Sequence, residues 1–425
     1  MRLHLACVAL LAGPIAGCNV HAVEKLAMTS AFRPVHDAGF VPSSPAPPKP
    51  PRPAASYQLL AGDMHCHISP PDSPDDVTRG VAETIARAHD EALDFVVLTP
   101  HLPARFFADP TMRARAVAGQ AELRRAFAAV GRAGGTVFIP GFEYTDHAFG
   151  HVNASFADLD AVLAEVPVDV ARADPARFFE RWVADGGLLV VNHPVVTPLR
   201  SIFARARADM SWRPWTSSAP YPPEIAAIGR LAAGFEAYNV AVTHLRDGLL
   251  LLDLDFSLRD VTGRLDREIL AARRRIAPVG GSDSHAGWLR AAMFVLAESR
   301  TEAGIRDAIV GGRTCVRSPA ACSLEVRPPG GAWAGVGGTV RSDAAVEVRA
   351  RGDQIVITRD GAPVALPASG KVATVDVPAG RCSLIRARVD DGYSAPVYVN
   401  CDFAEAGAQE DHVPRGDTAG ETGPR

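Results

Sequence analysis

Short apolar segments alternate with helical segments over most of this chain. The apolar segments expected to form strands are 57–67, 94–101, 136–145, 150–156, 186–194, 234–239 and 277–285. The helical segments lie at about 75–92, 110–131, 175–185 and 263–274. Such alternation indicates parallel βα units. Several units over about 260 residues match the size of an α/β barrel built from βα repeats.

Polar side chains fall where these strands end. They are His65, His67, His101, Glu143, His193, Asp283 and His285. In a parallel barrel the carboxyl ends of the strands gather on one face, where catalytic groups normally lie. We therefore expect side chains that are far apart in the sequence to converge in one pocket.

The residue types in this set point to metal binding. Clustered imidazoles and carboxylates are the ligands that Zn, Mn or Fe take in proteins. Residues two apart in a strand point to the same face, so His65 and His67 can reach one metal. Asp283 and His285 repeat that spacing on another strand.

Two carboxylates have particular places in the predicted site. Glu143 is suited to bridge two metals, and Asp72 lies five residues after His67 in a Pro-rich loop that can reach the same pocket. The set is large enough for one to three divalent cations.

Other histidines and acids have simpler interpretations. A single His or Glu at a strand end is more often a satisfied polar group than a ligand. We expect His89 and His244 to be structural or on the surface, and we rank His147 below His151, which opens an apolar strand. Glu236 either contacts substrate or orients a ligand.

The motifs together resemble one known superfamily. The segments DMHCH, LTPH, GFEYTD, GHVNA, NHP, GFEAYN and GGSDSHAG resemble the PHP (polymerase and histidinol phosphatase) superfamily, and look most like its carbaryl hydrolase branch. The resemblance covers roughly residues 57–318. It implies a distorted barrel of seven βα units, (β/α)7, holding up to three divalent metals on its C-terminal face. By motif it assigns metal ligands at His65, His67, Asp72, His101, Glu143, His151, His193, Asp283 and His285.

The chain departs from the family pattern at two places. The family's Thr-Asp-His reads TPH at 99–101, so Pro100 stands where the family has Asp. The family's Ser-Asp-Gly turn reads PDS at 71–73. The lost Asp bears on substrate handling or metal tuning more than on metal binding.

The expected chemistry is hydrolysis by a metal-activated water. Bound divalent metal lowers the pKa of water to about 7 and neutralises developing charge. His193 or His151 is the candidate to protonate the leaving group, although both also serve as ligands. Arg290 and Arg105 are candidates to hold a phosphate.

Three functions remain open on the sequence. The first is a metal-dependent hydrolase of phosphoesters, acting on a small-molecule substrate. The second is a carbamate, ester or amide hydrolase of the same fold. The third is a non-catalytic binding lipoprotein, against which the full ligand set argues. The 44 Lys+Arg and 48 Asp+Glu, a formal charge of -4, argue against a nucleic-acid binder.

The N-terminal residues resemble a targeting signal. Residues 1–18 carry a charge, a short apolar run and the ending IAGC, which resembles a bacterial lipobox with lipidation at Cys18. An ordinary secretory signal is the alternative. The Pro-rich segment 19–56 is expected to be a spacer. We therefore expect an exported protein, lipid-anchored on the outer side of a bacterial membrane.

The C-terminal residues have a different character. Short alternating runs over 319–402 predict a small antiparallel β-sandwich, and 403–425 are expected to be a disordered tail. Cys382 and Cys401 flank a hairpin expected to turn at Asp391-Gly392, so a disulfide is predicted there, with a second at Cys315–Cys322. The loop 195–230 is expected to shape the pocket mouth.

Overall fold

A computed structural model describes residues 57–132, 135–146, 150–194, 223–241 and 258–403. The expected signal peptide with Cys18, the Pro-rich spacer and residues 404–425 of the predicted tail lie outside the described residues. So do His147, His244 and the aromatic part of the loop 195–230. Within the described ranges, no helix combines the length and apolar character needed to cross a bilayer.

Among the described residues, eight strands lie between Gln58 and Gly281. They are β1 (Gln58–Cys66), β2 (Phe95–Leu98), β3 (His101–Pro103), β4 (Val137–Asp146), β5 (Gly150–Ser155), β6 (Leu188–Val191), β7 (Gly234–Asn239) and β8 (Ala277–Gly281). Strands β1, β2 and β4 are parallel neighbours, as are β6, β7 and β8. The expected mixed α/β class with a largely parallel sheet is confirmed.

One strand runs against the others. Strand β5 is antiparallel to both β4 and β6. Only three residues separate β4 from β5, which suffices for a hairpin, whereas a parallel crossover needs a dozen or more. The first residues of β5 therefore lie beside the last residues of β4, with His151 opposite Thr145.

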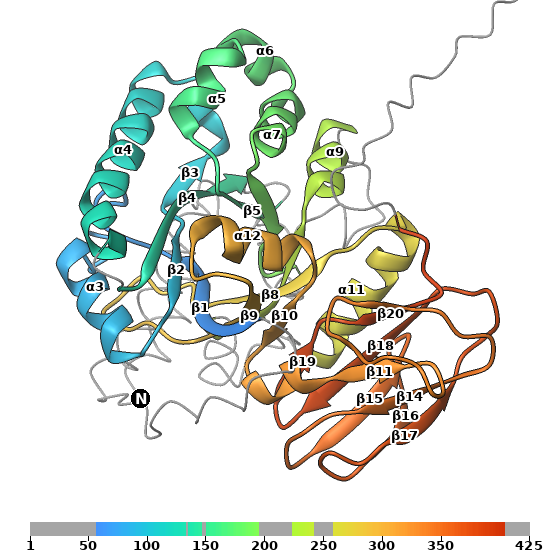
Figure 1. Ribbon diagram of the computed structural model, residues 1–425. Coiled ribbons are helices and arrows are strands. Elements are labelled where there is room, and N and C mark those ends of the chain that lie inside the picture. Colours follow the sequence, from blue (N-terminus) through green and yellow to red (C-terminus); the bar gives the residue numbers. More distant parts are fainter. Residues whose placement is uncertain (1–56, 133–134, 147–149, 195–222, 242–257, 404–425) are drawn as a thin grey trace, which may run out of the picture.

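Helices surround these strands, as Figure 1 shows. They are α3 (Val81–Asp90), η1 (Ala104–Phe107), α4 (Pro110–Arg132), α5 (Leu159–Glu165), α6 (Val168–Ala173), α7 (Pro175–Ala184), α9 (Pro223–Leu231), α11 (Leu258–Ala272) and α12 (Glu302–Val310). Helix α3 begins six residues later than the predicted start at 75, directly after Gly80.

Helix α7 illustrates how the sequence fixes an element. The side chain of Asp174 accepts a backbone N–H in the first turn, and Pro175 occupies the first helical position, where its missing N–H costs nothing. The helix buries Phe178 and Trp182 against the strands. The indole N–H of Trp182 also donates to the carbonyl of Ser155 in β5, at 3.1 Å.

The end of β8 returns to β1. The N–H of Asp283 donates to the carbonyl of His65 at 2.7 Å, and the N–H of His67 donates to the carbonyl of Ser284 at 3.2 Å. A parallel bridge joins Cys66 and Ser284. The last strand of the parallel series is therefore tied to the first at their carboxyl ends.

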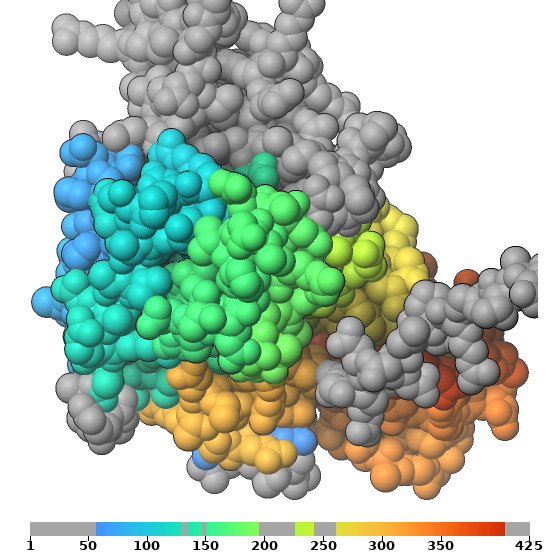
Figure 2. Space-filling model, turned by 90° about the horizontal axis from the view of Figure 1, so that it is seen from above, coloured from blue at the N-terminus to red at the C-terminus, as the bar shows by residue number. Residues whose placement is uncertain are grey.

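The remaining elements form the C-terminal β region. They are β9 (Met293–Ala297), β10 (Thr314–Val316), η2 (Pro319–Ser323), β11 (Glu325–Arg327), β12 (Ala334–Gly335), β13 (Thr339–Val340), β14 (Ala345–Arg349), β15 (Ile355–Arg359), β16 (Ala362–Ala365), β17 (Ala373–Asp376), β18 (Ser383–Val389), β19 (Gly392–Ser394) and β20 (Val397–Val399). Strands β12, β11, β14 and β17 form a separate antiparallel sheet. Figure 2 shows the orange and red C-terminal residues beside the blue-to-green helical layer.

The C-terminal β region shares a sheet with the strands β1 to β8. Strand β9 pairs with β1, β10 pairs with β9, and β19 pairs with β10, so one sheet passes through both parts. Helix α11 lies against the β region (Figure 1), where the buried side chains of Asp266 and Arg386 form an ion pair.

The part of the chain that the structure describes contains two disulfides, Cys315–Cys322 and Cys382–Cys401. They are the two pairings expected from the sequence. The predicted hairpin turn is one residue out, because β18 ends at Val389 and β19 begins at Gly392. Beyond the break after β19, β20 pairs with β18 in a shifted register that brings Ser383 opposite Val399.

Candidate metal centre

The cluster begins at the end of β1. The Nε2 atoms of His65 and His67 lie 3.2 Å apart, so both rings reach one point, as their spacing predicts. Cys66 points the other way, and its Sγ lies 2.8 Å from a guanidinium nitrogen of Arg79. Burial raises the pKa of this thiol to about 12, so Cys66 is not a thiolate ligand.

Glu143, near the end of β4, lies at the middle of the cluster. Its carboxylate oxygens lie 3.4 Å from Nε2 of His65, 3.7 Å from Nε2 of His67 and 3.5 Å from Nε2 of His101. They also lie 3.1 Å from Nδ1 of His151 and 3.4 Å from Nε2 of His193. One carboxylate thus faces five imidazoles, an arrangement suited to a bridging ligand.

Asp72 joins His67 and His101 on one side of the cluster. Its Oδ2 lies 3.3 Å from Nδ1 of His67, and its Oδ1 lies 3.2 Å from Nδ1 of His101. Oδ1 also accepts the backbone N–H of His101 at 2.8 Å. His101 opens β3 and does not end β2, contrary to the predicted strand 94–101.

Asp283 and His285 follow β8 and reach the same place. Oδ1 of Asp283 lies 3.3 Å from Nε2 of His65 and 3.2 Å from Nε2 of His67. The His285 ring stacks on the His67 ring with centroids 4.0 Å apart. Asp283 has a φ of 51° and His193 a φ of 24°. Positive φ in residues other than glycine is uncommon and often marks functional sites.

Glu236, on β7, holds other members of the cluster in place. Its Oε1 lies 3.0 Å from Nδ1 of His65, and its Oε2 accepts the backbone N–H of His193 at 2.6 Å. The Asn239 amide donates to Oε2 at 3.1 Å and to Asp283 Oδ2 at 3.1 Å. Of the two roles considered for Glu236, these contacts favour orienting a ligand.

The side chains also shift one another's pKa values. Burial would raise the pKa of Glu143, but the neighbouring His151 and His65 hold it well below its ordinary value. Burial disfavours a charged His65 ring, yet Asp283 and Glu143 hold the pKa of His65 well above its ordinary value. Burial and His67 lower the pKa of His285 to about 3. The carboxylates thus stay ionised in a buried place, where they require positive charge nearby.

The geometry fits a cation better than hydrogen bonds alone. Because the carboxylate of Glu236 can only accept, Nδ1 of His65 carries a proton. In a neutral ring, Nε2 then presents a lone pair, directed at an Asp283 oxygen and at Nε2 of His67. A metal ion would satisfy all of these electron-rich atoms together.

Within the described ranges, four groups of three potential ligands have their donor atoms within 4.8 Å of one another. They are His67, His101 and His285; His65, His193 and Glu236; His65, His67 and Glu143; and Glu143, His151 and His193. The groups share members, which is typical of a site that holds neighbouring cations. All nine ligand positions expected from the sequence lie in this cluster, and Glu236 joins it.

The supporting role of Arg79 was not predicted from the sequence. Its side chain contacts the backbone of His67 and of Ser284. Its buried guanidinium donates to the carbonyls of His67 at 2.7 Å and Trp288 at 2.8 Å, and to the Ser284 hydroxyl at 3.0 Å. It also donates to the carbonyl of Ala286. Arg79 therefore ties the loop that carries Asp283 and His285 to the end of β1. The predicted helix 75–92 included Arg79, and arginine is rarely buried, so the sequence held no signal for this role.

The amides of Asn192 and Asn153 were missed as well. Asn192 donates to Oε1 of Glu143 and to the Asn153 side chain, both at 2.8 Å. Asn153 donates to the carbonyl of Met64 at 3.3 Å. Their places within NHP and GHVNA were the available signal. These bonds hold the bridging carboxylate in position.

Arg290, Arg105 and His89 were the other residues considered from the sequence. Half-burial raises the pKa of Glu91, and the charge of Arg290 partly offsets that rise. The role of Arg290 in holding a phosphate stays a prediction. Arg105 is exposed, and the His89 side chain is 90% exposed, as expected for a surface residue.

Comparisons with known proteins give distant similarities. No family model and no curated protein matches the chain. The chain is similar to a two-domain protein from Bacteroides vulgatus that contains a predicted PHP-like metal-dependent phosphoesterase, with 15% identity, a TM-score of 0.44, and coverage of 84% of this chain and 100% of that one.

It is also similar to PsfC from Pseudomonas syringae, with 14% identity, a TM-score of 0.30, and coverage of 56% of this chain and 82% of that one. A third similarity is to the lesion-specific endonuclease EndoQ from Pyrococcus furiosus, with 14% identity, a TM-score of 0.33, and coverage of 63% and 62%. These similarities are too distant to add to the resemblance to the PHP superfamily, which rests on the motifs of the sequence.

Proposed function

We propose that this protein is a metal-dependent hydrolase of phosphoesters that belongs to the PHP superfamily. The observation that carries the proposal is the convergence of six imidazoles on Glu143, Asp72 and Asp283, in a buried cluster. Core packing does not require such a set, because charged groups are seldom buried without a functional reason.

Each part of the cluster has a role in the proposal. Glu143 is the bridging ligand, and the imidazoles with Asp72 and Asp283 surround it. Divalent cations held there would activate water for attack and polarise an oxygen of the substrate. Glu236 and Asn192 keep ligands in position through the hydrogen bonds described above. Of the two proposed proton donors, His193 has a raised pKa despite its burial, because Glu143 and Glu236 lie beside it. This favours His193 as the group that protonates the leaving group.

The phosphoester class comes from the family resemblance. Among the described ion pairs of the cluster, the cationic partner is always a histidine. The charge of a phosphate would then be balanced by the cations alone. A carbamate, ester or amide substrate, which carries no such charge, is therefore the second candidate.

We propose export and lipid anchoring at Cys18 as part of the same account. The two disulfides support it, because disulfides persist in oxidising compartments outside the cytosol. Radiolabelled palmitate should enter the full chain expressed in a bacterium, and Cys18→Ser should abolish the labelling. Equal labelling of both chains would reject the anchor.

A substrate panel tests the activity. The purified chain would be assayed with p-nitrophenyl phosphate, bis(p-nitrophenyl) phosphate and an aryl carbamate, before and after metal removal. We expect turnover of a phosphoester that a chelator abolishes and that His65→Ala eliminates, while the exposed control His89→Ala retains it. Turnover of the carbamate alone would select the second candidate. Loaded metal without turnover of any substrate would leave a binding protein.

A further inference from the structure

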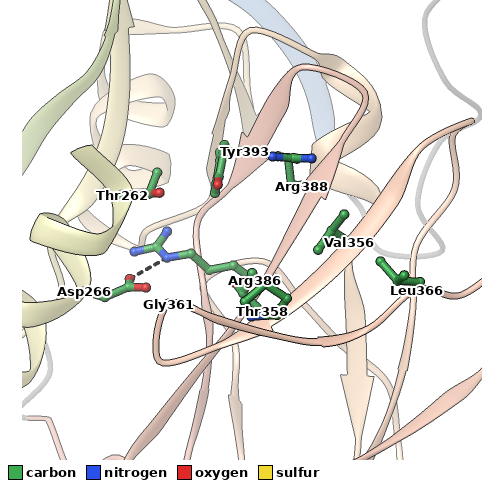
Figure 3. A pocket seen from close by; sticks show the side chains of 10 residues that line it. Thr262, Asp266, Val356, Thr358, Gly361, Leu366, Arg386, Arg388 and Tyr393 are labelled. Carbon is green, nitrogen blue, oxygen red and sulfur yellow. Dashed lines mark hydrogen bonds and ion pairs between the residues drawn. The ribbon is translucent and has the colours of Figure 1, made fainter. Parts of the chain in front are cut away.

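A cavity lies between α11 and the β region (Figure 3). It encloses about 260 Å³. Thr262 and Asp266 line it from α11, and strands β15, β16, β18 and β19 form the other walls. None of its lining residues belongs to the metal cluster.

A buried charge pair forms the inner end of this cavity. Nε of Arg386 donates to Oδ1 of Asp266 at 2.6 Å, and Nη1 donates to the carbonyl of Ser394 at 2.8 Å. The remaining nitrogen, Nη2, is buried without a hydrogen-bond partner. The buried pair with Asp266 therefore holds Arg386 in the cavity wall.

A second guanidinium supplies unbalanced charge. Arg388 lines the cavity from β18 and lies directly opposite Val356 of β15. No ion pair or hydrogen bond of its side chain is found within the part of the chain that the structure describes. Because Asp266 balances Arg386, the side chains that line the cavity carry one net positive charge, that of Arg388.

The other walls are apolar. Val356, Pro363 and the ring of Tyr393 line the cavity, and Leu366 lies at it with 77% of its surface exposed. A large exposed leucine beside a cavity suits contact with an apolar ligand group. The volume is slightly below the range of about 300 to 1,000 Å³ that is usual for ligand pockets. The space therefore suits one small organic molecule.

We infer that this cavity binds a small organic carboxylate, whose carboxylate group lies at Arg388 and whose apolar body lies against Val356 and Tyr393. One negative charge matches the one unbalanced positive charge. The carboxylate oxygens can accept from the guanidinium of Arg388. The apolar walls select against inorganic anions such as phosphate.

Calorimetric titration of the full chain with benzoate tests this site. The uncharged isostere benzamide and inorganic phosphate serve as comparison ligands. We expect benzoate to bind, benzamide to bind at least tenfold more weakly, in keeping with the loss of a charge-assisted contact, and phosphate not to bind at this site.

Two variants locate the binding. Arg388→Gln removes the unbalanced charge and should weaken benzoate roughly tenfold, whereas Arg351→Gln, an exposed control in the same β region, should leave the affinity unchanged. Val356→Trp fills the cavity and should abolish binding. Unfolding curves and intact disulfides check that each variant is folded.

The metal centre is a competing place for a carboxylate. Binding there would persist in Arg388→Gln and Val356→Trp and disappear in His65→Ala, and that result would overturn the inference. So would equal affinity for benzoate and benzamide, or an absence of benzoate binding at millimolar concentration.

Discussion

Replacement of Arg79 should separate the architecture of the metal centre from its ligands. The buried guanidinium of Arg79 donates hydrogen bonds to the carbonyls of His67, Ala286 and Trp288, all within the loops that carry ligands. Arg79→Met would leave these acceptors without their donor while keeping a side chain of similar length.

The magnitude follows from the contacts. A buried acceptor that loses its donor costs about 1 to 3 kcal/mol. Three acceptors lose their donor. Methionine carries no charge, so the variant avoids the cost of burying a guanidinium, and this offsets part of the loss. We expect the free energy of unfolding to fall by about 3 kcal/mol. Arg79→Lys keeps the charge without the planar fork and should give an intermediate loss.

Denaturant unfolding measures this loss, and the metal content of the folded variants measures its effect on the site. Arg87→Met, on the half-exposed face of α3, is the matched control and should change stability by less than about 1 kcal/mol. If Arg79→Met stays within about 1 kcal/mol of the parent and keeps its full metal content, the positioning role assigned to Arg79 is wrong.

Three other perturbations have defined outcomes. A disulfide that closes a loop of about 20 residues stabilises the fold by about 3 kcal/mol. Replacing Cys382 and Cys401 by alanine should therefore lower the free energy of unfolding by about that amount. An unchanged denaturation midpoint would contradict this. A methyl group at Gly281 would lie 2.2 Å from Cβ of His65. Gly281→Ala should therefore displace His65 and reduce the metal content of a chain that still folds. Full metal content in this variant would argue against the packing described. The pKa of Asp283 is lowered in the fold because nearby imidazoles outweigh its burial. Its stabilisation is thus present above its unfolded pKa, near 3.9, and is lost as the pH falls below it. Metal-free protein should therefore unfold more easily at pH 3 than at pH 6, and equal stability at the two would refute this contribution.

The sequence predicted the ligands better than the framework around them. Strand-end residues such as His65, Glu143 and Asp283 were identifiable because parallel strands bring their carboxyl ends to one face. His151 is different, since it begins a strand. It reaches the cluster because β5 reverses direction, and the three-residue link before β5 was a sufficient signal for that reversal.

The supporting contacts were beyond local sequence reasoning. Arg79 meets residues more than 200 positions away, and Arg386 pairs with Asp266 across 120 positions. No periodicity or motif encodes such pairs, because they depend on how finished elements pack. The hairpin turn before β19 was misplaced by one residue for a related reason, since the strand breaks before Pro396 and changes register there.

The central claim is that the cluster around Glu143 binds divalent metal. Elemental analysis of the purified full chain, with anomalous diffraction from its crystals, tests it most directly. The account predicts one to three equivalents of Zn, Mn or Fe, with an anomalous peak between His65, His67 and Glu143. It further predicts loss of metal in His65→Ala and retention in His89→Ala. A chain that stays metal-free when these cations are supplied, or metal retained unchanged in His65→Ala, would contradict it.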